Sequence, residues 1–324
     1  SHITGHALDS INNYPKTPAL NMFTKRQLYN ISRLSGFKNV DFYYPIPNHY
    51  VNGVLLSDNS LENAMVGNKI ADRFLNYDVN PNNLINEKML VDDFMQTDFT
   101  FFVNSYLMFL SDDNSPKTNY AQVHRGILTT LDDNCCKKIP LTEEAVKVLD
   151  NMFDFYNSET KRLKENNIEN IKYALCKKLD KGLTFELAKG IPMNRIALSS
   201  LFNHNQLLAI LMEYKELIYK LYPNRTYNDY KIQDIVLENV ALVENANIDL
   251  NMANIFKEED NYTIIDYDKT TDVIPLNYIV AQGLFVLAID SNFNFREVEY
   301  LKLLGLSERE IAIYQAIYAK NVRN

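Results

Sequence analysis

The chain has 324 residues and a formal net charge of −8 at pH 7, with a pI near 5.3. This acidic balance argues against general binding to nucleic acids or to anionic membranes, because both favour a basic surface. Hydrophobic residues make up 46% of the chain, including 21 Tyr and 17 Phe. That content excludes a disordered protein, and 324 residues are enough for two domains or one large two-lobed domain.

The three cysteines, Cys135, Cys136 and Cys176, have no C-x-x-C spacing. Their odd number indicates neither a disulfide framework nor a zinc site, and a reducing, cytoplasmic setting fits them best. The longest nearly uncharged run, 274–289, is short for a membrane span and predicts a buried helix. The chain begins with Ser-His and no signal peptide follows, so we expect a piece of a longer protein.

The first third predicts one helix followed by strands. A capping box at 24–27 opens the helix, which ends at Gly36. Its apolar residues at helical spacing are Leu28, Ile31 and Leu34. The predicted strands lie at 40–44, 51–56 and 99–110. The polar, Pro-containing segment 111–119 is the predicted domain boundary.

From Tyr120 onward the pattern changes. Residues 123–131 and 135–139 predict a hairpin with its turn at 132–134. Thr142 caps the next helix, whose predicted inner face consists of Ala145, Val148, Leu149, Met152, Phe153 and Tyr156. A strongly apolar helix follows at 206–222, and a second capping box at 307–310 opens the last helix.

The most informative stretch lies at 247–268, which predicts a loop, a strand, a tight turn and a second strand. A hairpin folded about Glu259–Asp260 places Asn254 opposite Ile265 and beside Asp266, and Asp249 lies in the preceding loop. Phosphoryl transfer needs one group that accepts the hydroxyl proton and oxygen ligands that hold Mg²⁺ against the phosphates. The alternative is a surface hairpin in which Asp and Asn act as turn formers.

These residues resemble the kinase-like phosphotransferases, which comprise aminoglycoside phosphotransferases, choline kinases and, more distantly, protein kinases. The pattern of that family is H-x-D-x4-N, followed by a strand that ends in a metal-binding Asp. Asp249, Asn254 and Asp266 match it, and Asn247 stands in place of the His. The resemblance implies ATP and Mg²⁺ as cofactors, Asp249 as the catalytic base, and Asn254 and Asp266 as metal ligands.

The order of hairpin, helix and further strands resembles the small lobe of this fold. The resemblance places the phosphate-contacting lysine at Lys137 or Lys138, and the following Ile-Pro-Leu favours Lys138. The alternative is a solvated lysine pair at a strand end. Residues 183–190 resemble the Phe-Glu-x-x-x-Gly crossover between lobes. There the backbone of Glu186 and Leu187 would hydrogen-bond adenine.

The first third resembles the closing section of class I methyltransferases found in bacterial surface-polysaccharide gene clusters. The matching segments are 24–28, 36–37, 42–47 and 103–106. Asn48 and His49 stand where the motif of that family has Asp-Tyr, and the nine glycines form no Gly-x-Gly. The tight turn that lets a backbone approach S-adenosylmethionine is therefore missing, and we expect no binding of that cofactor.

Together the resemblances imply an α+β chain in three parts. They are a partial methyltransferase-like unit at 1–115, a kinase-like small lobe at 116–190 and a helical large lobe at 191–324. The order is similar to that of the methyltransferase–kinases that cap O-antigen polysaccharides. This implies a Mg²⁺- and ATP-dependent kinase that acts on a sugar hydroxyl of a glycan or glycolipid, with other glycan-biosynthesis enzymes as partners.

Two other hypotheses stay open. One is a catalytically inactive kinase-like scaffold or binding module of a glycan-assembly complex. Three departures favour it: Asn247 for His, the lack of a glycine-rich loop before Lys138, and Asp268–Lys269 where relatives have Glu-Trp. Since Gly126 alone cannot supply a cradle of backbone N–H groups, we expect weak Mg²⁺-ATP binding at best. The other hypothesis is a fragment of a methyltransferase dependent on S-adenosylmethionine.

Overall fold

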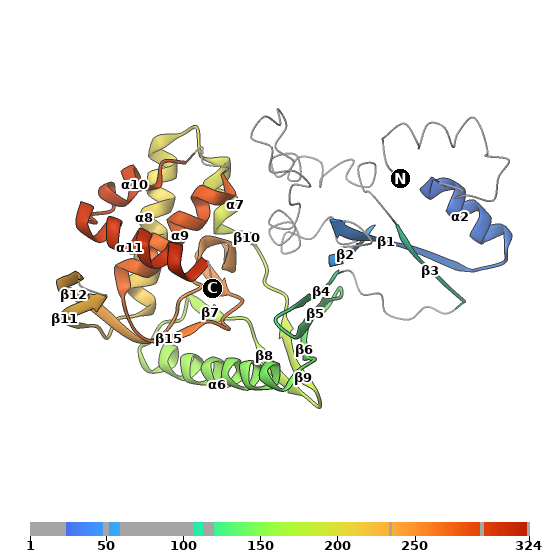
Figure 1. The fold of residues 1–324 in the computed structure, drawn as a ribbon, viewed down its shortest axis with the longest axis horizontal. Helices are drawn as coiled ribbons and strands as arrows, with labels where there is room; N and C mark the ends of the chain where they lie inside the picture. The colour runs from blue at the N-terminus through green and yellow to red at the C-terminus, as the bar shows by residue number, and fades with distance from the viewer. Residues whose placement is uncertain are drawn as a thin grey trace. The chain divides into compact units, whose positions relative to one another are not determined.

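The computed structural model describes residues 24–47, 52–58, 106–112, 120–232, 235–291 and 295–322. The chain forms two compact units, which are Ser1–Val146 with Leu179–Thr184, and Lys147–Lys178 with Phe185–Asn324 (Figure 1). Sheets and long helices occur together, so the expected α+β class is confirmed. The part boundaries at 115 and 190 stay predictions. Of the methyltransferase-like segments, 48–49 and 103–105 lie outside the described residues.

One large sheet takes most of its strands from the first unit. Its strand order is β3-β1-β2-β4-β5-β6-β9-β8. The strands are β1 Asn39–Pro47, β2 Asn52–Ser57, β3 Leu107–Ser111, β4 Tyr120–His124, β5 Ile127–Leu131, β6 Cys135–Pro140, β8 Cys176–Leu179 and β9 Gly182–Glu186. β2 pairs with β4, Val54 opposite Gln122, so strands from before and after the predicted boundary segment share one sheet. The predicted strand residues 99–105 lie outside the described residues.

Helix α2 (Lys25–Leu34) begins at the expected capping box. Thr24 Oγ1 accepts from the Gln27 amide at 3.2 Å, and Gln27 Oε1 accepts from the Thr24 amide at 2.9 Å. The predicted apolar stripe is not the buried face, because Ile31 is exposed and Leu34 is 89% exposed. Ser32 is buried instead, and its hydroxyl is satisfied by the Leu28 carbonyl one turn earlier, at 2.8 Å.

The predicted strand 123–131 is in fact two strands. A two-residue turn at Arg125–Gly126 separates β4 from β5, and both turn residues have positive φ, 47° and 72°. Such turns match the right-handed twist of a hairpin. The next turn lies where it was predicted, because Asp132 Oδ1 accepts from the amides of Asn134 and Cys135, each at 2.9 Å.

Helix α6 (Glu143–Glu165) carries a buried stripe that differs in part from the prediction. Ala145, Leu149 and Met152 are buried as expected, but Val148 is exposed. The stripe continues instead through Phe155 and Glu159. Glu159 was not predicted to be buried, because an acidic residue on a helix predicts a solvent-facing position.

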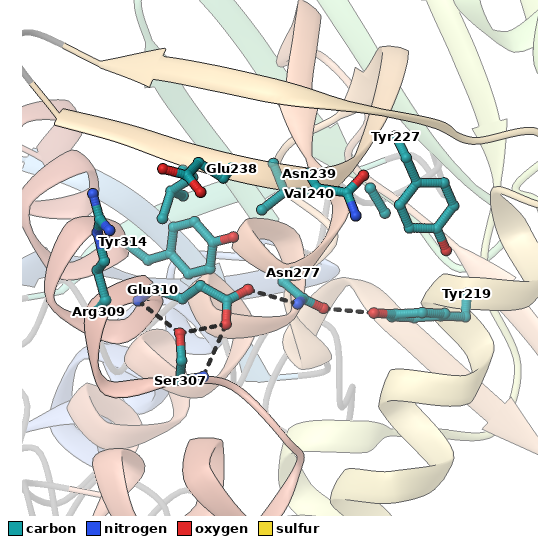
Figure 2. A pocket seen from close by; sticks show the side chains of 12 residues that line it. Tyr219, Tyr227, Glu238, Asn239, Val240, Asn277, Ser307, Arg309, Glu310 and Tyr314 are labelled. Atoms are coloured by element: carbon teal, nitrogen blue, oxygen red, sulfur yellow. Dashed lines mark hydrogen bonds between the residues drawn. The ribbon is translucent and has the colours of Figure 1, made fainter.

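The second unit is mostly helical. Its other helices are α7 Met193–Ser199, α8 His204–Leu221, α9 Leu276–Asp290, α10 Glu297–Leu303 and α11 Glu308–Val322. The uncharged run forms α9, which is buried as predicted. No helix in the described part of the chain is long and apolar enough to cross a membrane. The capping box before α11 is also confirmed, since Ser307 and Glu310 bond reciprocally at 2.8 and 3.2 Å (Figure 2).

Two small sheets complete this unit. The first has the order β10-β13-β14-β7, and the second the order β11-β12-β15. Their strands are β7 Ile171–Tyr173, β10 Ile191–Pro192, β11 Thr226–Ile232, β12 Ile235–Asn247, β13 Ile255–Glu258, β14 Asn261–Ile264 and β15 Thr270–Pro275. A single 3₁₀ turn, η2 Met252–Asn254, precedes β13. β12 and η2 thus flank the loop that holds Asp249.

The close backbone contact between β9 and β6 at Gly182 can be tested by substitution. Gly182 has φ of +108°, and a Cβ there would lie 2.2 Å from the Lys138 carbonyl oxygen. We expect Gly182→Ala to lower the free energy of unfolding by about 3 kcal/mol, through backbone strain and steric overlap. Gly36→Ala is the control, since φ is +96° but no described atom lies within 4 Å. Urea denaturation that gives equal losses for both variants would contradict the close approach.

Candidate active site

The predicted hairpin forms, with its turn at Glu259–Asp260. Beyond the paired strands, the Ile265 amide donates to the Asn254 carbonyl at 2.9 Å. Asn254 therefore lies opposite Ile265 and beside Asp266, as predicted. It is the last residue of η2 rather than a strand residue.

Asp249 lies in the loop between β12 and η2, with its side chain 17% exposed. Its carboxylate accepts from Asn251 Nδ2 at 3.0 Å and from Lys269 Nζ at 3.1 Å. The turn-forming bonds are made by its neighbours, because Asn247 Oδ1 accepts from the Asp249 amide and Asn251 Oδ1 from the Ala253 amide. Asp249 is therefore not the cap of this turn, which removes one argument for a purely structural role.

The electrostatic surroundings of Asp249 suit a general base. Burial raises the pKa of its carboxyl, and the negative charge of Asp266 acts in the same direction. Lys269 opposes them, but its side chain is 46% exposed. A carboxylate whose pKa is raised towards the working pH is a stronger proton acceptor.

Asp266 lies two residues after the end of β14 and has φ of +56°. A non-glycine residue in this left-handed region costs about 1–3 kcal/mol, and such strain concentrates at functional sites. The next residue is anchored, because the buried Tyr267 donates its hydroxyl to the Ala174 carbonyl at 3.0 Å. The strained conformation is thus fixed by packing on one side.

Asn254 and Asp266 could together hold a hard cation. Asn254 Nδ2 donates to the Asp249 carbonyl at 2.9 Å, and no described residue donates to Asn254 Oδ1. An amide oxygen and a carboxylate are the ligand types that Mg²⁺ takes, with waters and phosphates completing the shell. Within the described ranges, no three His, Cys, Asp or Glu side chains form a metal-binding group, so these two residues would need such extra ligands.

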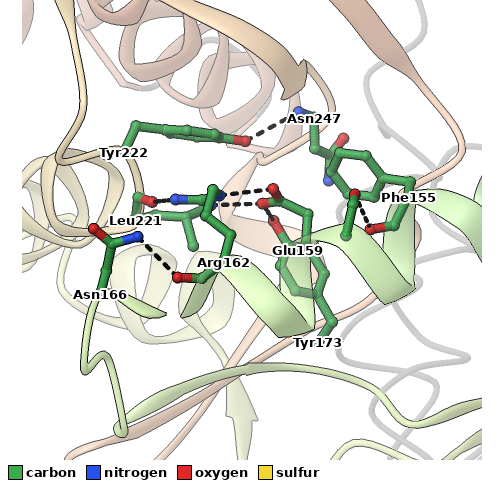
Figure 3. Close-up of polar contacts among 9 residues, drawn as sticks. Phe155, Glu159, Arg162, Asn166, Tyr173, Leu221, Tyr222 and Asn247 are labelled. Carbon is green, nitrogen blue, oxygen red and sulfur yellow. Dashed lines mark hydrogen bonds and ion pairs between the residues drawn. The ribbon is translucent and has the colours of Figure 1, made fainter. Parts of the chain in front are cut away.

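A buried polar network supports the start of the loop (Figure 3). The Asn247 amide donates to the Tyr222 hydroxyl at 3.0 Å, and the Arg162 guanidinium lies 4.9 Å from the centre of the Tyr222 ring. Arg162 also pairs with Glu159 at 2.6 Å and donates to the Leu221 carbonyl. Through these contacts α6 and the end of α8 hold the loop in which Asp249 lies.

The other predicted residues lie elsewhere. Lys138 is on β6 in the first unit and only 8% exposed, whereas Lys137 is half-exposed and pairs with Asp132 at 3.2 Å. Glu186 ends β9, its side chain pairs with Lys172, and its amide already donates to the Leu175 carbonyl. Among the described residues, no hydrogen bond engages the backbone of Leu187.

Sequence reasoning missed several residues that shape this site. In the sequence, Lys269 was noted only as a departure from the family pattern, although its ammonium contacts the candidate base Asp249. Glu159, Arg162 and Tyr222 were not singled out. An i, i+3 Glu–Arg pair in line with the predicted apolar stripe was the available signal for the buried ion pair.

No protein-family model and no curated protein matches this chain. Solved structures do match. They are aminoglycoside phosphotransferases. A streptomycin–ATP–APH(2'')-IIa ternary complex is 13% identical, covers 63% of this chain and 82% of its own, and has a TM-score of 0.32. ADP-bound APH(2'')-Ib is 13% identical, covers 62% of this chain and 82% of its own, and has a TM-score of 0.32. The gentamicin–APH(2'')-IIa complex is 12% identical, covers 73% of this chain and 86% of its own, and has a TM-score of 0.33.

The Tyr222 hydroxyl should be necessary for an ordered loop. In Tyr222→Phe the buried Asn247 amide loses its acceptor, so we expect a loss of about 1–2 kcal/mol in unfolding free energy. Hydrogen exchange at 247–251 should also become faster. Tyr227→Phe, on an exposed ring, is the matched control. Unchanged exchange at 247–251 in Tyr222→Phe would rule out this supporting role.

The raised pKa of Asp249 has a consequence for stability. When the pKa of a carboxyl is higher in the folded state than its unfolded value of about 3.9, the folded protein loses stability as the pH rises from the unfolded pKa through the folded pKa. Relative to wild type, Asp249→Asn should therefore be more stable at pH 7 than at pH 4. Thermal melts at both pH values measure this, with the exposed Glu258→Gln as control. If the melting temperature of the wild type instead rose relative to that of Asp249→Asn between pH 4 and pH 7, the folded protein would stabilise Asp249 as the anion, contrary to this prediction.

Proposed function

We propose that this protein is an ATP- and Mg²⁺-dependent phosphotransferase with Asp249 as its catalytic base. The supporting observation is that Asp249, Asn254 and Asp266 meet at one loop and hairpin. There the Asp249 carboxylate, with its raised pKa, lies near the Asp266 carboxylate, and no described residue donates a hydrogen bond to Asn254 Oδ1. Phosphoryl transfer depends on such positioning and on charge neutralisation.

Each residue has a distinct role in this proposal. Asp249 orients the acceptor hydroxyl and takes its proton. Asn254 Oδ1 and the Asp266 carboxylate would hold Mg²⁺, which neutralises phosphate charge when bound. Lys269 fixes the Asp249 carboxylate at 3.1 Å, and its half-exposed ammonium adds positive charge next to the base.

Nucleotide binding would use residues of other elements. The backbone N–H and C=O of Leu187, which no hydrogen bond engages in the described part of the chain, would offer a donor and an acceptor to an adenine edge, whereas the Glu186 amide is already bonded. The buried Lys138 is the proposed phosphate contact. The two-residue turn at Arg125–Gly126 offers few N–H groups for phosphates, so affinity for Mg²⁺-ATP should be weak.

The proposed acceptor is a sugar hydroxyl of a glycan or glycolipid, with other glycan-biosynthesis enzymes as partners. This finer assignment rests on the sequence resemblance alone. A second candidate is a catalytically inactive scaffold, favoured by the short Arg125–Gly126 turn and by Asn247 in place of His. The two candidates differ in whether the three residues affect nucleotide binding and turnover.

Three variants separate these candidates. Asp249→Asn should lower ADP release by about 10²–10⁴-fold while it spares Mg²⁺-ATP binding. Asp266→Asn should lose Mg²⁺-dependent binding and turnover together, and Asn254→Ala should show a milder form of that loss, because a neutral amide binds a divalent ion less strongly. Glu258→Gln, at the far end of the same hairpin, is the control.

Calorimetry with a non-hydrolysable ATP analogue, with and without Mg²⁺, measures binding. ADP release with a panel of monosaccharides and short oligosaccharides measures turnover. Lys138→Ala should bind the ATP analogue more weakly than the wild type does. If the analogue binds equally to all variants and no sugar promotes ADP release, the scaffold hypothesis is correct.

A further inference from the structure

The large sheet has two terminal strands, and their outer edges differ in charge. β3 ends the sheet on one side and β8 on the other. β8 carries the exposed Lys177 and Lys178, and lysines on an edge strand oppose the addition of another strand. β3 has the sequence Leu-Met-Phe-Leu-Ser, without charge, proline or glycine. Within the described part of the chain, β1 is the only strand that pairs with β3. β3 therefore has the features of an edge to which a further strand can be added.

The side chains of β3 are apolar on both faces of the sheet. Leu107 and Phe109 lie on one face, because side chains alternate along a strand, and they are 42% and 54% exposed. Met108 lies on the opposite face, where its Sδ accepts a hydrogen bond from Ser32 Oγ of α2 at 3.4 Å. Exposed apolar side chains on an uncharged edge strand favour contact with another protein surface.

The last turn of α2 adds a second apolar surface at this edge. Lys25, in the first turn of the helix, pairs at 2.7 Å with Asp58, which directly follows β2. Ser32, near the other end of the helix, instead contacts β3. α2 therefore crosses the sheet towards β3. Its last turn carries Ile31 and Leu34, which are both exposed.

The edge of β3 is complementary to a second copy of itself. When two copies of β3 pair antiparallel with Phe109 on the two-fold axis, Met108 of each faces Leu110 of the other. No like charges meet in this register. The Asp112 carboxylates of the two copies lie at opposite ends of the pair, about 20 Å apart at the rise of a strand.

The same register brings the two α2 helices to packing distance. The two copies of Met108 are separated by two residues along the strands and by one strand spacing, which is about 8 Å in total. Because Ser32 contacts Met108, the C-terminal ends of the two helices come to a similar separation. Helices pack at about 8–10 Å. Ile31 and Leu34 of the two copies can then bury one another.

We propose that two copies of this chain associate through β3 and the last turn of α2, so that the large sheet continues across a two-fold axis. The surface is smaller than a standard interface of about 20–30 residues a side, so we expect a weak dimer with a Kd of about 1–100 μM. The surface belongs to the first unit and the Asp249 loop to the second. The proposal therefore goes beyond the proposed phosphotransfer and does not require it.

Sedimentation equilibrium of the full chain, across this concentration range, should show the mass rising from 37.6 kDa towards twice that value. Phe109→Lys places two ammonium groups against each other at the axis and should raise the Kd about 10-fold or more. Leu34→Lys changes a side chain that is 89% exposed, so the monomer should stay folded while the Kd rises about 10-fold. Phe202→Lys, on a fully exposed side chain of the second unit, is the control and should leave the Kd unchanged.

Hydrogen exchange locates the contact. The amides of 107–110 should exchange more slowly as the protein concentration rises, whereas those of 226–232 on β11, an edge strand of the second unit, should not change. The proposal is overturned if the chain stays monomeric well above the expected Kd, or if the dimer withstands both Phe109→Lys and Leu34→Lys. It is also overturned if exchange at 107–110 does not depend on concentration.

Discussion

The hydrogen bond from the Ile265 amide to the Asn254 carbonyl is the interaction on which the candidate active site depends. It extends the pairing of β13 and β14 past the end of both strands, where twisted strands would otherwise diverge. Asn254 and Asp266 are brought together by it, and the Asn254 side chain then bonds the carbonyl of Asp249. One backbone contact therefore sets the geometry of all three residues.

The backbone of the loop around Asp249 is held by two buried phenols, one in the middle of α8 and one at its C-cap, whereas the Asp249 carboxylate is bonded only by side chains. The Tyr214 hydroxyl donates to the Leu250 carbonyl at 2.7 Å, and the Tyr222 hydroxyl accepts from the Asn247 amide. The backbone is thus fixed on both sides of Asp249, which preorganises the carboxylate. The Glu159–Arg162 pair adds α6 to this support, and its buried charges satisfy each other and the Tyr173 hydroxyl.

The same elements also line a cavity of about 410 Å³. α8 provides Tyr214 and Tyr222 to the loop and Tyr219 to the cavity, and β12 contributes to both. α9 packs against α8 so closely that a Cβ at Gly283 would lie 2.1 Å from Tyr214 Oη. A change that separates these two helices would therefore disturb the loop and the cavity together.

The sequence by itself determined the local features: the capping boxes at Thr24 and Ser307, the Asp132 turn and the pairing of Asn254 with Ile265. These depend on hydrogen bonds between residues close in the chain, so the spacing of residue types is sufficient to predict them. Only the tertiary structure decided the burial of Glu159, the pairing of Lys269 with Asp249 and the cavity at Tyr314. Their partners lie on other elements, and whether a polar side chain is buried depends on the charge or hydroxyl that those elements bring to it.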